Sequence, residues 1–138
     1  MVSGQDWRGG SRTVPAVLEV TVIKTKRAYR PAAAADGCRV LVERLWPRGL
    51  SKAEAAVDLW LKEVAPSPEL RQWFGHDPQK WERFCQKYWA ELARKGEAVE
   101  LLRAKAREGE LTLVYGSRDE EHNAAVALKL YLERHPAG

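Results

Sequence analysis

The stretch CRVLVERLWPRGLS, from Cys38 to Ser51, decides the fold, because an almost unbroken apolar run ends in a charged and sharply bent segment. Its first part, Cys38 to Leu45, is typical of a strand buried on both faces, as the strands of a parallel sheet are. Pro47 cannot donate to a strand ladder, so we expect the strand to end there. The stretch therefore predicts an inner strand followed by a bend that carries two arginines, Arg44 and Arg48.

Two other runs predict strands, VLEVTVIKT from Val17 to Thr25 and LTLVYGS from Leu111 to Ser117. β-Branched residues alternate along the first run, and the second is mostly apolar. The segment from Val57 to Ser67 alternates in part like a strand and in part has helical spacing, so both structures stay open for it.

Helical periodicity predicts three helices between the second and third strands and a short one before them. Ser51 and Glu54 have capping-box spacing, which predicts a short helix from Lys52. Cap residues followed by proline predict helices that begin at Pro68 and at Pro78. A further helix is expected from about Glu97 to Glu108, ended by Gly109.

A last helix follows the third strand. Ser117 and Glu120 again have capping-box spacing, so we expect this helix to begin near Asp119. Strands that alternate with helices predict a small three-layer α/β domain, in which a short, mainly parallel sheet is flanked by helices. We expect residues 14–138 to form this single domain and residues 1–13 to form a loose tail.

The composition is that of a soluble globular protein, with 45% hydrophobic and 30% charged residues among 138. No run predicts a membrane span or a signal segment. A net charge of +4 favours anionic partners only mildly. The two cysteines, Cys38 and Cys85, lack the spacing of a metal site or of a disulfide scaffold, which fits a reducing cytoplasm. No motif indicates a cofactor.

Candidate functional residues follow the second and third strands. Parallel strands bring their carboxyl ends to one edge of the sheet, where open α/β domains bind ligands. The residues expected to bind a ligand at this edge are Arg44, Trp46, Arg48, Tyr115, Ser117, Asp119 and Asn123. An arginine fork fits phosphate or carboxylate, although either arginine can instead pair with a nearby carboxylate. Trp46 can likewise stack on a ligand or fill the core.

His122 is the candidate general acid or base, because a histidine titrates near neutral pH. Ser117 can cap the expected helix or face the ligand. His76 can add a second acid/base group or lie in a simple turn. A metal site at Asp119, Glu120 and His122 is disfavoured, because no second ligand pair has metal spacing.

Three segments, RVLVERLWPRGLSK, DLWLKEVAPSPELRQWFGHDPQKWERF and LTLVYGSRDEEHNAAVALKLYL, cover most of the chain from Cys38 to Leu132. In these segments the sequence resembles the family named domain of unknown function 488, in its YeaO-like branch. The resemblance implies a small α/β domain without an established activity. Glu43 stands where the family usually has aspartate. Glu121, His122 and Asn123 stand where the wider family often has Cys-His-Arg, so a cysteine mechanism is not implied.

The leading hypothesis is a cytoplasmic domain that binds a small, phosphate-bearing anion at the sheet edge, with acid/base chemistry at His122 left open. A rival is a nucleic-acid-binding module, in which Trp46 and Tyr29 stack on bases. Its backbone contacts would come from Lys24, Lys26, Arg27 and Arg30. A third alternative is a protein-interaction domain without catalysis.

Overall fold

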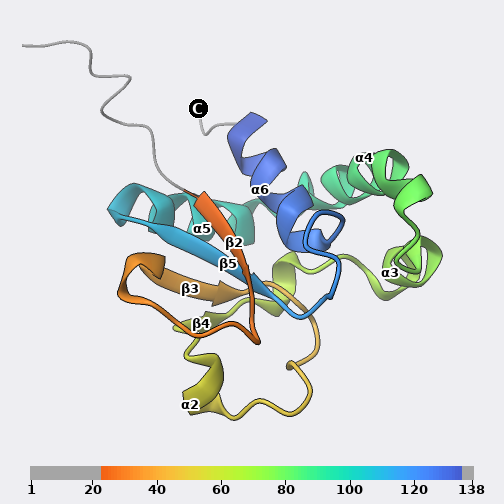
Figure 1. The fold of residues 1–138 in the computed structure, drawn as a ribbon. Coiled ribbons are helices and arrows are strands. Elements are labelled where there is room, and N and C mark those ends of the chain that lie inside the picture. The colour runs from red at the N-terminus through yellow and green to blue at the C-terminus, as the bar shows by residue number, and fades with distance from the viewer. Residues whose placement is uncertain (1–22, 135–138) are drawn as a thin grey trace, which may run out of the picture.

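The computed structural model describes residues 23–134, and within them four parallel strands form one sheet. The strands are β2 (Ile23–Arg27), β3 (Cys38–Leu41), β4 (Leu59–Trp60) and β5 (Leu111–Tyr115), in the order β2-β5-β3-β4 (Figure 1). The predicted α/β class with a parallel sheet is confirmed. The predicted tail and the start of the predicted first strand, at Val17, lie outside the described residues.

All four strands end at the same edge of the sheet, because they are parallel and in register. In the register of the ladder, Arg27 pairs with Tyr115 and Leu41 pairs with Val114. One further hydrogen bond on each side of β5 extends the ladder. The N–H of Ala28 donates to the carbonyl of Tyr115, and the N–H of Val42 donates to the carbonyl of Val114. The segments that follow β2, β3 and β5 therefore start close together, as the sequence predicts.

β3 is shorter than predicted, because it ends at Leu41 rather than at Leu45. After Val42 the chain leaves the ladder, and Glu43 bonds to the backbone of β5's continuation through its side chain instead. The open segment from Val57 to Ser67 contains both the short strand β4 and a 3-10 helix, η2 (Lys62–Val64). Both spacings seen in its sequence are thus real.

The four longer helices pack on one face of the sheet. They are α3 (Pro68–Phe74), α4 (Trp81–Leu92), α5 (Gly96–Glu108) and α6 (Ala124–Arg134) (Figure 1). The predicted helix from Pro78 begins with a 3-10 turn, η3 (Pro78–Lys80), before α4. The core beneath these helices combines alternate strand residues with the helices' apolar sides, and it includes Val40, Leu113, Phe84, Tyr88, Leu102 and Leu128. No helix in the described part of the chain is long and apolar enough to cross a bilayer.

The opposite face has a thinner cover, made of the short helix α2 (Lys52–Ala55), the 3-10 helix η1 (Ala34–Asp36) and loops. α2 begins with the predicted capping box between Ser51 and Glu54. Here Leu41 and Val114 pack against a second apolar cluster with Ala28, Trp46, Leu50, Val57 and Trp60.

The last helix begins at Ala124, so the prediction of a start near Asp119 is wrong. The side chain of Ser117 accepts the N–H of Asp119 at 3.2 Å, and one carboxylate oxygen of Asp119 accepts the N–H groups of Glu121 and His122. Such short polar side chains bond their own backbone in turns and so compete with helix. Asn123 bonds the N–H of Val126 at 3.0 Å, as an N-cap does.

Candidate functional site

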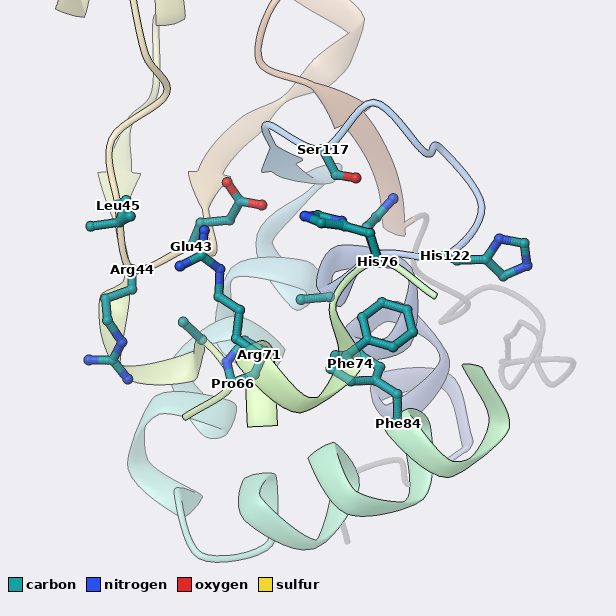
Figure 2. A pocket seen from close by; sticks show the side chains of 13 residues that line it. Glu43, Arg44, Leu45, Pro66, Arg71, Phe74, His76, Phe84, Ser117 and His122 are labelled. Carbon is teal, nitrogen blue, oxygen red and sulfur yellow. The ribbon is translucent and has the colours of Figure 1, made fainter. Parts of the chain in front are cut away.

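A pocket opens at the carboxyl ends of β3 and β5, on the face covered by the long helices (Figure 2). It lies between the segment after β3, helix α3 with its following turn, and the loop that joins β5 to α6. Its lining residues are Glu43, Arg44, Leu45, Ala65, Pro66, Arg71, Phe74, His76, Phe84, Ser117, His122, Asn123 and Ala124. This is the edge at which the sequence predicted a ligand site.

Glu43 provides a partly buried carboxylate to the pocket. Its Oε1 accepts the backbone N–H of Gly116 at 3.0 Å. Burial raises the pKa of Glu43, although the Gly116 bond and the charges of Arg71 and His76 oppose that rise. Its second oxygen has no hydrogen bond within residues 23–134, so it remains available to a donor from outside the chain.

Arg71 extends from α3 toward the carboxylate of Glu43 (Figure 2). The two charges interact through space, but no ion pair joins them. Among the described residues the guanidinium of Arg71 makes no hydrogen bond or ion pair. Within residues 23–134 the pocket therefore contains an arginine whose side-chain N–H groups form no bond, near a carboxylate that has only one of its oxygens bonded.

His76 lies in the turn after α3, which the chain enters through two left-handed residues, Gly75 (φ 53°) and His76 itself (φ 59°). A left-handed conformation is costly for a residue with a Cβ, although histidine tolerates it better than most. The turn directs the imidazole toward Ser117 and the Glu43 side of the pocket (Figure 2). His76 thus lies in a turn, as one of the two alternatives predicted, and it also lines the pocket.

The predicted site residues divide into two groups. Arg44, Ser117, His122 and Asn123 line the pocket, whereas Trp46, Arg48, Tyr115 and Asp119 do not. Arg44 is exposed at the rim, and its guanidinium points away from Glu43 (Figure 2).

Trp46 and Arg48 follow the chain away from the pocket. Trp46 packs edge-on against Trp60, with ring centres 5.3 Å apart, in the cluster on the opposite sheet face, and its Nε1 donates to the carbonyl of Leu50. The side chain of Arg48 is exposed, while its carbonyl accepts the hydroxyl of Tyr29. The chain crosses the sheet edge between Arg44 and Trp46, so the two arginines do not face one ligand.

Tyr115 and Asp119 lie outside the lining but contact Asn123, which is part of it. Tyr115 is only 2% exposed, and burial raises the pKa of its hydroxyl, which interacts with the Asn123 side chain. Asn123 also donates to the carbonyl of Asp119 at 2.8 Å. The backbone bond from Glu121, followed by contacts with His122, holds the pKa of Asp119 below its ordinary value.

His122 is held by two neighbours. Its Nδ1 lies 3.0 Å from a carboxylate oxygen of Asp119, and its ring meets Trp81 edge-on at 5.3 Å. The imidazole points away from Glu43 (Figure 2). An acid/base role for His122 would therefore need a ligand that extends past the Glu43–Arg71 side of the pocket.

Arg71 was not predicted from the sequence, and Glu43 was noted as the position where the family usually has aspartate but not as a ligand-binding residue. Arg71 lies on the exposed side of a short helix, where its sequence context is that of a surface residue. Within residues 23–134 no three His, Cys, Asp or Glu side chains are grouped as they would be around a metal ion.

Comparison with known proteins gives one family and several relatives. Residues 22–137 match the family model described as the inactive DUF488-N3 subclade. The uncharacterized protein YeaO of Escherichia coli (strain K12) is 41% identical over 110 residues, which are 80% of this chain and 96% of that protein. The uncharacterized protein Rv3073c of Mycobacterium tuberculosis (strain H37Rv) is 39% identical over 91 residues, 66% of this chain and 77% of the relative. No solved structure matches the chain.

Proposed function

Because the chain belongs to the DUF488 family, in the subclade described as inactive, we propose that it binds a small phosphate-bearing anion in the pocket between Glu43 and Arg71. The description of the subclade favours binding over turnover. The orientation of His122, whose ring points away from Glu43, agrees with that preference.

The unpaired guanidinium of Arg71 is the observation that carries the proposal. Arginine keeps its charge at all physiological pH values and presents two parallel N–H donors that match a phosphate. Arg44 at the rim adds a second positive charge, against a single carboxylate, Glu43, in the lining. This balance favours an anion over a cation.

The nucleic-acid alternative loses support, because each of its proposed cations bonds to another group of the protein, although the pair of Arg30 with Glu120 is exposed. Lys26 pairs with Asp36, and Arg30 pairs with Glu120. Lys24 bonds Glu110 and a backbone carbonyl, and Arg27 donates to the carbonyl of Ser117 at 2.8 Å. Trp46, which was to stack on bases, lies against Trp60 instead.

We also propose that the protein resides in the cytoplasm. Cys38 and Cys85 are both free thiols, and thiols stay reduced in that compartment.

Thermal unfolding in the presence of two phosphate monoesters, glycerol 1-phosphate and n-propyl phosphate, tests the proposal. A compound that binds only the folded state stabilises it by about 2.7 kcal/mol at 100 times its Kd. We expect the midpoint of the wild type to rise and that of Arg71→Ala to stay constant. Arg48→Ala is the matched control, because this arginine is exposed outside the pocket, and its midpoint should rise like the wild type's. No rise in the wild type, or an equal rise in Arg71→Ala, would overturn the proposal.

A further inference from the structure

We propose that the ligand is a phosphate ester of a short polyol, whose phosphate binds Arg71 while a hydroxyl group donates to Glu43. This inference rests on the proposed function and specifies the chemistry of the molecule bound. It starts from the unequal use of the two oxygens of Glu43.

The second carboxylate oxygen of Glu43 can accept a further hydrogen bond. Gly116 occupies Oε1, and nothing within residues 23–134 donates to the second oxygen. A carboxylate removed from water is costly unless its oxygens are hydrogen-bonded. The pocket's own charged donor, Arg71, does not form the bond, although it points toward Glu43 (Figure 2). A hydroxyl on the ligand would supply the missing donor.

A bare phosphate fits this pocket less well than its ester. Seated on Arg71, it would bring negative oxygens toward the carboxylate of Glu43, and like charges at such range repel. A hydroxyl between the phosphate and Glu43 replaces that repulsion with a hydrogen bond. Glu43 would thus select for hydroxylated esters and against inorganic phosphate.

The rest of the lining matches a short carbon chain that carries polar groups. Phe74 and Phe84 stack with ring centres 4.3 Å apart and form an apolar wall, to which Pro66 adds. His76 and Ser117 contribute polar groups on the side of the pocket across from Arg44 (Figure 2). A pocket with an apolar wall and a few directed polar groups is typical of small-molecule sites.

Calorimetric titration with two matched probes tests the inference. Glycerol 1-phosphate and n-propyl phosphate share the phosphate and the three-carbon chain, and they differ only in two hydroxyl groups. We expect the wild type to bind glycerol 1-phosphate about tenfold more tightly, the size expected of one hydrogen bond to a charged group. Arg71→Ala should lose both probes.

Glu43→Ala should change the two affinities in opposite directions. Glycerol 1-phosphate should bind more weakly, because its hydroxyl loses the acceptor. Propyl phosphate should bind more tightly, because a negative charge beside the phosphate has gone. A purely structural role of Glu43 would weaken both. Glu43→Gln, which retains an acceptor for Gly116, should show the same loss of preference and serves if the alanine variant does not fold.

The outcomes separate the two proposals. Equal affinity of the wild type for both probes would overturn the polyol inference and leave anion binding intact. Absence of binding by either probe would overturn both. A preference that survives in Glu43→Gln and Glu43→Ala would assign hydroxyl recognition to another residue and also overturn the inference.

Discussion

The backbone N–H of Gly116 donates to Oε1 of Glu43 over 3.0 Å, so the residue that follows β5 positions the carboxylate that follows β3. The bond joins neighbouring strands just beyond the point where their ladder ends. It also fixes the orientation of the partly buried carboxylate, of which only Oε1 is hydrogen-bonded within residues 23–134.

Gly116→Ala should destabilise the protein. An added Cβ would lie 3.2 Å from Oε1 of Glu43, tighter than ordinary contact, so the carboxylate that Gly116 positions would have to shift by a few tenths of an ångström. We expect a loss of about 1–3 kcal/mol, the range for added methyl groups in packed sites. Gly96→Ala is the control, because its Cβ meets nothing within 4 Å at the start of α5. Urea unfolding measures both, and equal effects would contradict the packing argument.

The pH dependence of stability should change in Glu43→Gln. Burial raises the pKa of Glu43 above its ordinary value of 4.5, so the folded state binds this proton more tightly than the unfolded chain does. The stabilising effect is complete below the ordinary value and is lost as the pH rises through the raised pKa. As the pH rises above about 4.5, the thermal midpoint of the variant should therefore increase relative to that of the wild type. A constant difference between pH 4 and pH 8 would contradict the raised pKa.

Asp36→Ala should be among the most damaging substitutions on the thinly covered face. Asp36 accepts a 2.7 Å bond from Arg39, which is only 3% exposed, and it also pairs with Lys26. Removal of one partner of a buried pair leaves an uncompensated charge and costs about 3–5 kcal/mol. Glu110→Ala, which breaks the exposed pair with Lys24, should cost about 1 kcal/mol or less. Denaturant unfolding compares them, and similar losses would show that the buried pair has no special weight.

The carboxylate of Asp36 should also make the stability of the wild type fall at acid pH. Burial alone would raise the pKa of Asp36, but bonds from Ala33, Lys26 and Arg39 outweigh it and hold the pKa below 3.8. Since the folded-state pKa is depressed, the stabilisation is present above the ordinary value and is lost as the pH falls through the folded value. The stability difference between wild type and Asp36→Ala should therefore shrink below about pH 4.

Asn123→Ala should destabilise the protein more than Ser117→Ala. Asn123 caps the N-terminus of α6 through Val126, and its amide also bonds Asp119. Loss of a cap costs about 0.5–2 kcal/mol. The side chain of Ser117 bonds only within its own turn, to Asp119. Thermal unfolding of the two variants measures both losses, and a larger loss in Ser117→Ala would contradict the capping role of Asn123.

The class of fold was predictable from the sequence, because local periodicity reports how an element is buried. The apolar runs at Cys38 and Leu111 indicated inner parallel strands, and both are. The caps at Ser67 and Asp77 marked true starts, since each side chain bonds a backbone N–H two or three residues later. The capping-box spacing of Ser117 and Glu120 gave a wrong helix start, because Ser117 and Asp119 form hydrogen-bonded turns with their own backbone there.

The candidate site was predictable only as an edge of the sheet. Parallel topology placed Glu43, Arg44 and Ser117 near one another, since each directly follows a strand. It did not place Arg71, which comes from a helix that the chain reaches only after β4.

The sequence by itself determined three of the four strands, the approximate extents of the helices and the edge at which polar residues gather, because each depends on patterns within a few neighbouring residues. Only the tertiary structure decided that Arg71 faces Glu43 while Trp46 and Arg48 leave the pocket. These outcomes depend on the position of a helix after a crossover connection. They also depend on which backbone group hydrogen-bonds a side chain, as the N–H of Gly116 bonds Glu43. Contacts between segments distant in sequence produce no local periodicity of apolar residues, so they cannot be predicted from the sequence pattern alone.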